Sequence, residues 1–464
     1  MRRFLLFREG APYDPTLLAQ TERNLRALPF FRSVRVVPGP PHDGVVDVDV
    51  LTQDAWTTEF EVHLGRGGGE TTWAAGITEH NLAGLGKQLG FLYNEDVERT
   101  NRFLEYSDPA LFGAYWSGTF LYAENSDGSR RFVRVAKPFT STLDASSARG
   151  LWDRDRLQER LYADGVVTST YARKHQQVHL SWGAALSPGD LRARRLTAGI
   201  DFFQDDFQAL ADHPDDVLPA PRDFRYVFVG FEDVSSDFVA ENYVDRAERV
   251  EDFNLGPRLA AQVGFSPKAF GAPATSFAVA GEASRGWRIG PRSFLRGEVG
   301  FRTRLQGGAQ NAILAGTVML VWKHKTALPQ TTVARLRLDR GWNLDRDVQF
   351  FADGDHGLRG YHLYAFEGDR RVLVNLEHRI FGGFEILQIF SLGAAVFVDS
   401  GAAVPPGAPL RLSSMKTDAG VGLRIGIARA ALNTVLRLDC AYAFDADPLG
   451  RRGWLVSFSS GQAF

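Results

Sequence analysis

The chain has 464 residues, 44% of them hydrophobic and 23% charged, so it can bury a large core as two soluble domains or close one large barrel. It contains no run of 18 or more apolar residues, which excludes a transmembrane helix. The formal net charge of −2 argues against a nucleic-acid partner held by phosphate attraction, and a single cysteine, Cys440, excludes an internal disulfide.

The first 53 residues have the pattern of a small α+β unit. Asp14 is a good N-cap and Pro15 a good first helical residue, and leucines then recur at helical spacing until Pro29. Residues 31–37 alternate as a strand, 38–44 are a turn rich in Pro and Gly, and 45–51 alternate again. We therefore expect a helix and two strands in residues 1–53.

The N-terminus resembles only the beginning of a secretion signal. Two arginines at residues 2 and 3 precede an apolar run, but this run ends after four residues at Arg8, and no small-residue cleavage site follows it. We expect that the given chain lacks its native start.

From Trp56 onward, residues 54–464 consist of alternating segments of about ten residues separated by turn signals. For example, Phe60 and Val62 alternate with Glu59 and Glu61. The pattern gives about 20 segments, with five of them after residue 369. It predicts an all-β transmembrane antiparallel barrel with an even number of strands, so that both chain ends lie on one side of the membrane.

One loop of this region, residues 343–369, places Arg359 between a leucine and a glycine in the motif Leu-Arg-Gly-Tyr. In the strand 372–380 that follows, apolar residues occupy every second position, which puts Glu377 on the opposite face. The same alternation puts Asp399, in the motif Phe-Val-Asp-Ser-Gly, away from the aliphatic face of its strand. An arginine can hold two carboxylates in charge-assisted hydrogen bonds, so we predict that Arg359 pins its loop to the barrel wall.

The last strand is predicted to run to the end of the chain. Trp454, Val456 and Phe458 face one way, and Phe464 has the same parity.

The loop and strand motifs together resemble the paired signature of the BamA/TamA superfamily of outer-membrane barrels, which also includes bacterial surface antigens. By this resemblance Arg359 is the inserted arginine, Gly360 and Tyr361 are its motif neighbours, Asp399 is its partner, and Gly401 ends the strand motif. The resemblance implies 16 strands, fewer than the pattern of alternating segments. It also implies that residues 1–53 are the C-terminal half of a POTRA domain.

The family resemblance also implies a function without bond chemistry, which is the insertion of membrane proteins or the translocation of polypeptides. The expected location is the bacterial outer membrane with the POTRA domain in the periplasm. The expected partners are outer-membrane lipid and a client polypeptide or unfolded barrel. The client would meet the POTRA edge and a lateral seam between the first and last strands, which carries Phe60, Val62, Trp454, Val456, Phe458 and Phe464. Two other hypotheses stay open: a passive pore or surface antigen, and the membrane anchor of a larger chain with a missing N-terminal enzyme domain.

Motifs for catalysis, metals or cofactors are weak in this sequence. The glycine-rich run 84–90 has its third glycine one place late for a dinucleotide loop and lacks a βαβ unit around it. His175 and His179 share a strand face, but their basic neighbours favour a hairpin over a metal site. We predict no enzymatic activity, no cofactor and no metal.

Overall fold

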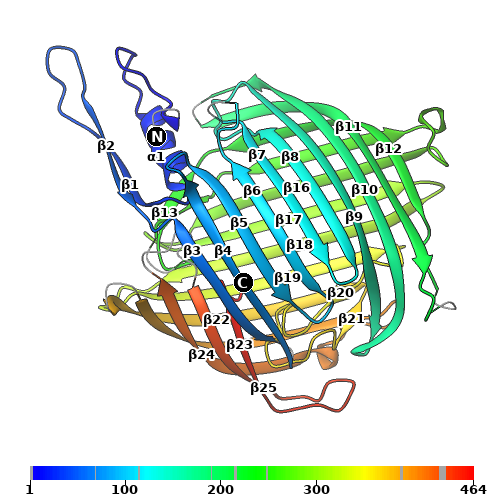
Figure 1. The fold of residues 1–464 in the computed structure, drawn as a ribbon. Coiled ribbons are helices and arrows are strands. Elements are labelled where there is room, and N and C mark those ends of the chain that lie inside the picture. The colour runs from blue at the N-terminus through cyan, green and yellow to red at the C-terminus, as the bar shows by residue number, and fades with distance from the viewer. Residues whose placement is uncertain are drawn as a thin grey trace.

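The computed structural model describes residues 4–67, 69–112, 115–189, 191–213, 217–246, 249–386, 390–427 and 435–464, with side chains except at 61–67 and 383–385. Within these ranges no helix is both long enough and apolar enough to span a bilayer. Figure 1 shows a small N-terminal module beside a large antiparallel β-structure.

The N-terminal module consists of α1 (Pro15–Arg26), β1 (Phe31–Pro38) and β2 (Val48–Asp54). The helix begins where its N-cap predicts, because the Asp14 carboxylate accepts the Thr16 N–H at 2.8 Å. Leu25 and Phe31 are buried in a cluster that also includes Ala110, which lies in the turn after the strand that ends at Asp108, so the module packs against one end of the main sheet. β2 begins three residues later than the sequence predicts, because a bridge between His42 and Val45 lengthens the turn.

The remaining chain forms one antiparallel sheet in which each strand pairs with its neighbours in the chain and β26 meets β3, closing a barrel. Within the described ranges, its strands are β3 (Thr58–Gly67), β4 (Glu70–Leu82), β5 (Lys87–Glu95), β6 (Thr100–Asp108), β7 (Ser117–Asn125), β8 (Gly128–Lys137), β9 (Ser146–Ala163), β10 (Val166–Ser187), β11 (Arg192–Ala209), β12 (Arg222–Ser235), β15 (Arg258–Ser266), β16 (Ser276–Arg288), β17 (Phe294–Leu305), β18 (Ala309–Lys323), β19 (Gln330–Trp342), β22 (Arg370–Ile386), β23 (Phe390–Val404), β24 (Lys416–Ile427), β25 (Val435–Ala443) and β26 (Trp454–Ser460).

The number of barrel strands agrees with the pattern of about 20 alternating segments in the sequence. It corrects the expectation of 16 strands that came from the family resemblance. Five strands, β22 to β26, follow the Arg359 loop as predicted, so the additional strands precede it. They were visible in the sequence because each hairpin carries its own alternation and turn signal.

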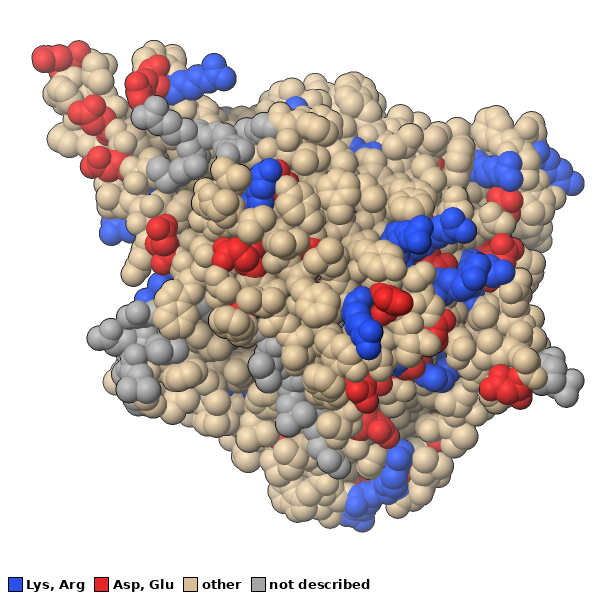
Figure 2. All heavy atoms as spheres, viewed as in Figure 1, with Lys and Arg blue, Asp and Glu red and all other residues tan. Residues whose placement is uncertain are grey.

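The two faces of the sheet have opposite chemistry. On β22 and β23, Val374 is 44% exposed and Val398 is 45% exposed on the outer face, whereas Glu377 and Asp399 on the inner face have no exposed surface. An apolar outer wall around a polar lumen is the arrangement of transmembrane β-barrels. In Figure 2 most of the visible wall is neither acidic nor basic.

Two connections carry short strand pairs of their own. The segment 236–257 contains β13 (Phe238–Glu241) and β14 (Glu251–Asn254), and the loop 343–369 contains β20 (Phe350–Phe351) and β21 (Glu367–Gly368). Because strand direction alternates around the barrel, the segment 236–257 lies at the same end as the N-terminal module. The loop 343–369 lies at the opposite end. A 3-10 turn (Lys268–Phe270) and another (Leu412–Ser414) lie in other connections at that opposite end.

Candidate functional site

Arg359 reaches from the loop 343–369 to three carboxylates on the inner wall of the barrel. Its Nε and Nη2 donate to the two oxygens of Asp399 at 2.7 and 3.1 Å, and its Nη1 donates to Glu377 at 2.5 Å and to Asp439 at 3.4 Å. The guanidinium also lies over the Phe397 ring, 3.4 Å from its centroid. These hydrogen bonds bring together the arginine and the two carboxylates, Glu377 and Asp399, that the sequence singles out. The group is buried, since Arg359 is only 3% exposed.

Further ion pairs connect the carboxylates of this cluster to other arginines. Glu377 also accepts from Arg379 Nε at 2.7 Å and lies 3.1 Å from Arg424, and Arg424 donates to Asp439 at 2.6 Å. Three buried arginines thus face three buried carboxylates, counting Arg359 and Asp399. The buried Asp418 lies directly opposite Asp399, and Arg437 lies 3.7 Å from Asp439. Burial alone lowers the pKa of Arg359, but Asp399 and then Glu377 outweigh it and raise the pKa above its ordinary value. Removing one member leaves an unpaired buried charge, which costs about 3–5 kcal/mol.

The residues beside Arg359 seat the loop against the wall. Leu358 and Tyr361 are buried in one apolar cluster, and the Tyr361 hydroxyl donates to the Thr417 carbonyl at 3.0 Å. A Cβ added at Gly360 would lie 2.7 Å from the Asp418 Cβ, and one at Gly401 would lie 2.8 Å from the Val372 carbonyl oxygen. These two motif glycines therefore allow the close packing between loop and strands.

A second set of contacts holds the loop 343–369 farther from its tip. Asp345 accepts from Arg304 at 2.7 Å and from Arg222 at 2.9 Å, and Arg222 also donates to Asp347 at 2.6 Å. The Tyr364 ring stacks on Tyr162 with centroids 3.7 Å apart. The loop is thus anchored to strands on opposite sides of the lumen.

The segment 236–257 enters the barrel from the other end and meets the same cluster. Val244 and Leu255 pack with Phe294 in a buried apolar group. The Val244 carbonyl accepts from Arg379 Nη1 at 2.5 Å, and Arg379 in turn donates to Glu377. The Glu377 carboxylate therefore links the loop 343–369, through Arg359, to the segment 236–257, through Arg379.

The segment 236–257 also contacts the N-terminal module. Arg26 of α1 donates to both oxygens of Asp252, at 3.0 and 2.7 Å, and Arg249 donates to the Leu28 carbonyl at 3.2 Å. Arg23 lies over the Phe238 ring, 4.4 Å from its centroid. A continuous chain of contacts thus runs from α1 to Arg359.

The strand pair of this segment contains a carboxyl group that titrates near neutral pH. Burial, with a contribution from Asp245, raises the pKa of Glu251 to about 7, and its oxygen accepts the N–H groups of Asp245 and Arg246 at 3.1 Å. Since the folded state binds the proton more tightly than the unfolded state, the Glu251 contribution to stability is present below about pH 4.5 and is lost as pH rises toward 7. We expect thermal unfolding in detergent to shift to lower temperature across this interval.

Glu251→Gln is the matched variant for that prediction, because its amide oxygen can still accept both backbone N–H groups. The variant should melt with less pH dependence between pH 5 and 8 than the wild type. The same pH dependence in both proteins would contradict the assignment to Glu251.

The residues predicted to line the seam between the first and last strands differ in exposure and in pairing. Phe60 is 76% exposed, Trp454 is 69% exposed and Val456 is 46% exposed on the outer face, whereas the side chain of Val62 lies outside the described part. Phe458 lies opposite Arg66 and supplies the register pair between β26 and β3.

The prediction that the last strand continues to Phe464 is wrong. β26 ends at Ser460, and Gly461 has a φ of +84°, which turns the chain away from the strand. The Phe464 ring instead lies 5.1 Å from Arg335 and 5.8 Å from Arg379, centroid to guanidinium carbon, inside the lumen. An aromatic face next to buried cations gains a cation–π attraction that the outer wall does not offer.

Sequence reasoning missed Arg424, Asp439 and the whole segment 236–257 as parts of the site. A signal existed on β24, where Gly420 and Gly422 leave space on the inner face: a Cβ at Gly422 would lie 2.0 Å from the Asp439 carboxylate. Glycines at alternate positions of a strand indicate close approach of other groups.

An apolar wall and a polar lumen occupied from both ends are features that this chain shares with transmembrane β-barrels. The outer membrane protein assembly factor BamA of Neisseria meningitidis serogroup B (strain ATCC BAA-335 / MC58) is 24% identical over 190 residues, covering 38% of this chain and 23% of that protein. The match thus spans about a quarter of the length of that curated relative. No protein-family model matches the chain.

Solved structures to which the chain is similar include BamA from Haemophilus ducreyi lacking POTRA domains 1–3, at 15% identity and a TM-score of 0.45, covering 99% of this chain and 81% of that one. CdiB from Acinetobacter baumannii is 12% identical, with a TM-score of 0.48, covering 99% and 70%. The sequence match to BamA, added to the motif residues around Arg359, supports a BamA/TamA-type superfamily for this chain.

Proposed function

We propose that this chain is an outer-membrane barrel that inserts membrane proteins or translocates polypeptides. Residues 1–53 are the C-terminal half of a POTRA domain in the periplasm, and residues 54–464 are the barrel. The loop 343–369 is latched inside the lumen by Arg359. The proposed function involves no bond chemistry.

The observation that carries this proposal is the weak junction between β26 and β3. Among the described residues its register is Phe458 opposite Arg66, whereas β3 pairs with β4 from Thr58 to Gly67. A short junction costs little to open, and an opened edge offers unpaired backbone groups to an incoming strand. A client barrel strand is the partner that such an edge fits.

The N-terminal module offers a second edge of the same kind. Its sheet consists of β1 and β2, and no third described strand pairs with it. Leu51 and Val45 near its outer margin are each 54% exposed. Strand addition to this edge would deliver a polypeptide to the barrel.

A disulfide across the junction tests the function. Arg66→Cys/Phe458→Cys, made with Cys440→Ser, joins two residues that lie directly opposite in an antiparallel pair, where Cα separations suit a disulfide. We expect the oxidised variant in proteoliposomes to lose acceleration of client-barrel insertion and to regain it on reduction.

The matched control is Val421→Cys, which faces the native Cys440 across the extensive β24–β25 pairing. Oxidation of this control should leave client insertion unchanged. If both oxidised proteins insert a client as fast as the reduced wild type, the junction is no gate, and a passive pore or the membrane anchor of a larger chain becomes the better account.

A further inference from the structure

A group of cations lies on the outer wall of the barrel, on β8, β9 and β10. Arg131 is directly opposite Arg154, and Arg156 is directly opposite Lys174. Their positions alternate with inward residues and continue the outer face of Trp152 and Val178. We call these four residues the outer basic patch: Arg131, Arg154, Arg156 and Lys174.

The pairing within the outer basic patch is unfavourable as it stands. Like charges directly opposite one another on a sheet destabilise it, and here two such pairs are adjacent. None of the four forms an ion pair with another described residue. Asp206 is opposite Lys174, but its carboxylate accepts from Gln204 at 3.1 Å.

Two inward cations on the same strands, unlike the four outward ones, form ion pairs. Arg130 pairs with Asp153 at 2.7 Å, and Arg173 pairs with Asp155 at 3.2 Å. These two inward cations are paired within the protein. The four cations of the outer basic patch form no ion pair among the described residues, and Asp206 is the outward carboxylate that lines their hollow. An uncompensated set of four neighbouring cations calls for an anion from outside the chain.

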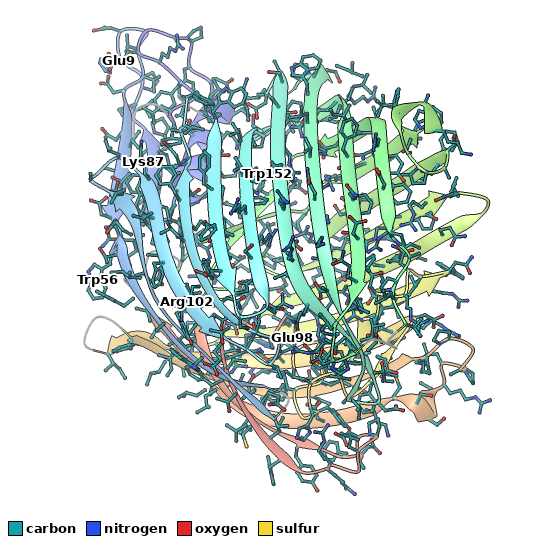
Figure 3. All side chains as sticks on the ribbon, turned by 45° about the vertical axis from the view of Figure 1, so that its right-hand side comes forward. Glu9, Trp56, Lys87, Glu98, Arg102 and Trp152 are labelled. Carbon is teal, nitrogen blue, oxygen red and sulfur yellow. The ribbon has the colours of Figure 1, made fainter. Side chains whose placement is uncertain are left out.

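The patch borders the apolar band of the wall. On β10 the outward residues after Gln176 are Val178, Leu180 and Trp182, and Leu180 and Trp182 are 50% and 60% exposed. The patch lies on the side of this band away from the N-terminal module, and it lines a hollow of about 320 Å³. Figure 2 shows basic side chains gathered on this wall, and Figure 3 labels Trp152 on β9 and Arg102 on β6.

We propose that the outer basic patch binds the phosphorylated headgroup of a lipid in the membrane leaflet opposite the N-terminal module. Arginine guanidinium groups match phosphate oxygens in bidentate hydrogen bonds, and four cations balance two phosphate groups. The acyl chains then lie along Trp152 and Val178. A free phosphate would gain nothing from that apolar wall, so the position selects a lipid. This site rests on the membrane placement in the proposed function and goes beyond it.

Native mass spectrometry of the full chain in neutral detergent tests the site, with cardiolipin, a lipid with two phosphates, as the titrated probe. Arg154→Gln/Lys174→Gln should weaken cardiolipin binding by at least about ten-fold. The matched control is Arg102→Gln, because Arg102 lies on the same outer face but is directly opposite Glu124. We expect this control to bind cardiolipin as the wild type does.

Thermal unfolding supplies a second readout. Without lipid, the double variant should be at least as stable as the wild type, because it relieves like-charge repulsion. Cardiolipin should raise the melting temperature of the wild type and not that of the double variant.

Equal cardiolipin binding by all three proteins, or its displacement by about 10 mM inorganic phosphate, would overturn the lipid site. Failure of the wild type to refold into neutral bilayers would instead overturn the membrane placement, so the two failures are distinguishable.

Discussion

Arg359→Ala is expected to release the loop 343–369 while leaving the barrel wall folded. The substitution leaves Asp399, Glu377 and Asp439 with one arginine fewer, and an unpaired buried charge costs about 3–5 kcal/mol. The strand hydrogen bonds of the wall do not pass through Arg359. Limited proteolysis should therefore cut the loop much faster in the variant, with an unchanged melting temperature of the wall.

The variant Arg359→Lys tests whether the positive charge alone holds the loop or whether the two hydrogen bonds to Asp399 are needed. Lysine restores the positive charge but cannot make the two parallel hydrogen bonds to Asp399, so it should protect the loop only in part. A loop as resistant in Arg359→Ala as in the wild type would show that the contacts of Asp345 and Tyr364 hold it alone.

Glu377→Ala is expected to have the larger effect because it acts on both insertions. Glu377 is the shared acceptor of Arg359 from the loop and of Arg379, which holds the Val244 carbonyl of the segment 236–257. Its loss leaves three buried arginines with two carboxylates, again at a cost of about 3–5 kcal/mol or more. Both the loop 343–369 and the segment 236–257 should become sensitive to proteases.

Glu298→Ala is the control for a carboxylate on a barrel strand, since Glu298 is exposed and pairs with Arg296 only at 3.6 Å. It should leave both segments resistant. If Glu377→Ala releases the loop alone, the two insertions are independent, and the chain of contacts from α1 to Arg359 carries no coupling.

Local alternation was sufficient to predict the inner face of the candidate site. Glu377 and Asp399 could be assigned inward because their strand neighbours are aliphatic at every second position. The helix of residues 15–26 could be placed from its N-cap and its leucine spacing. In each case the deciding interactions are close in the sequence.

The rest of the site depends on contacts that no local pattern encodes. Asp439 is 80 residues from Arg359, and Val244 is 135 residues from Arg379. These residues meet only because the barrel closes and two connections fold into it. Phe464 was assigned to the wrong surface because strand parity continues only while the strand does, and Gly461 ends it.

Single-channel conductance in a planar bilayer tests the central claim, a lumen closed by the latched loop, most directly. The refolded wild type should give a small, flickering conductance, because the loop 343–369 and the segment 236–257 meet inside it. Arg359→Ala should enlarge that conductance or make it unstable. A large, steady conductance that is the same in both proteins would contradict the latch and favour a passive pore.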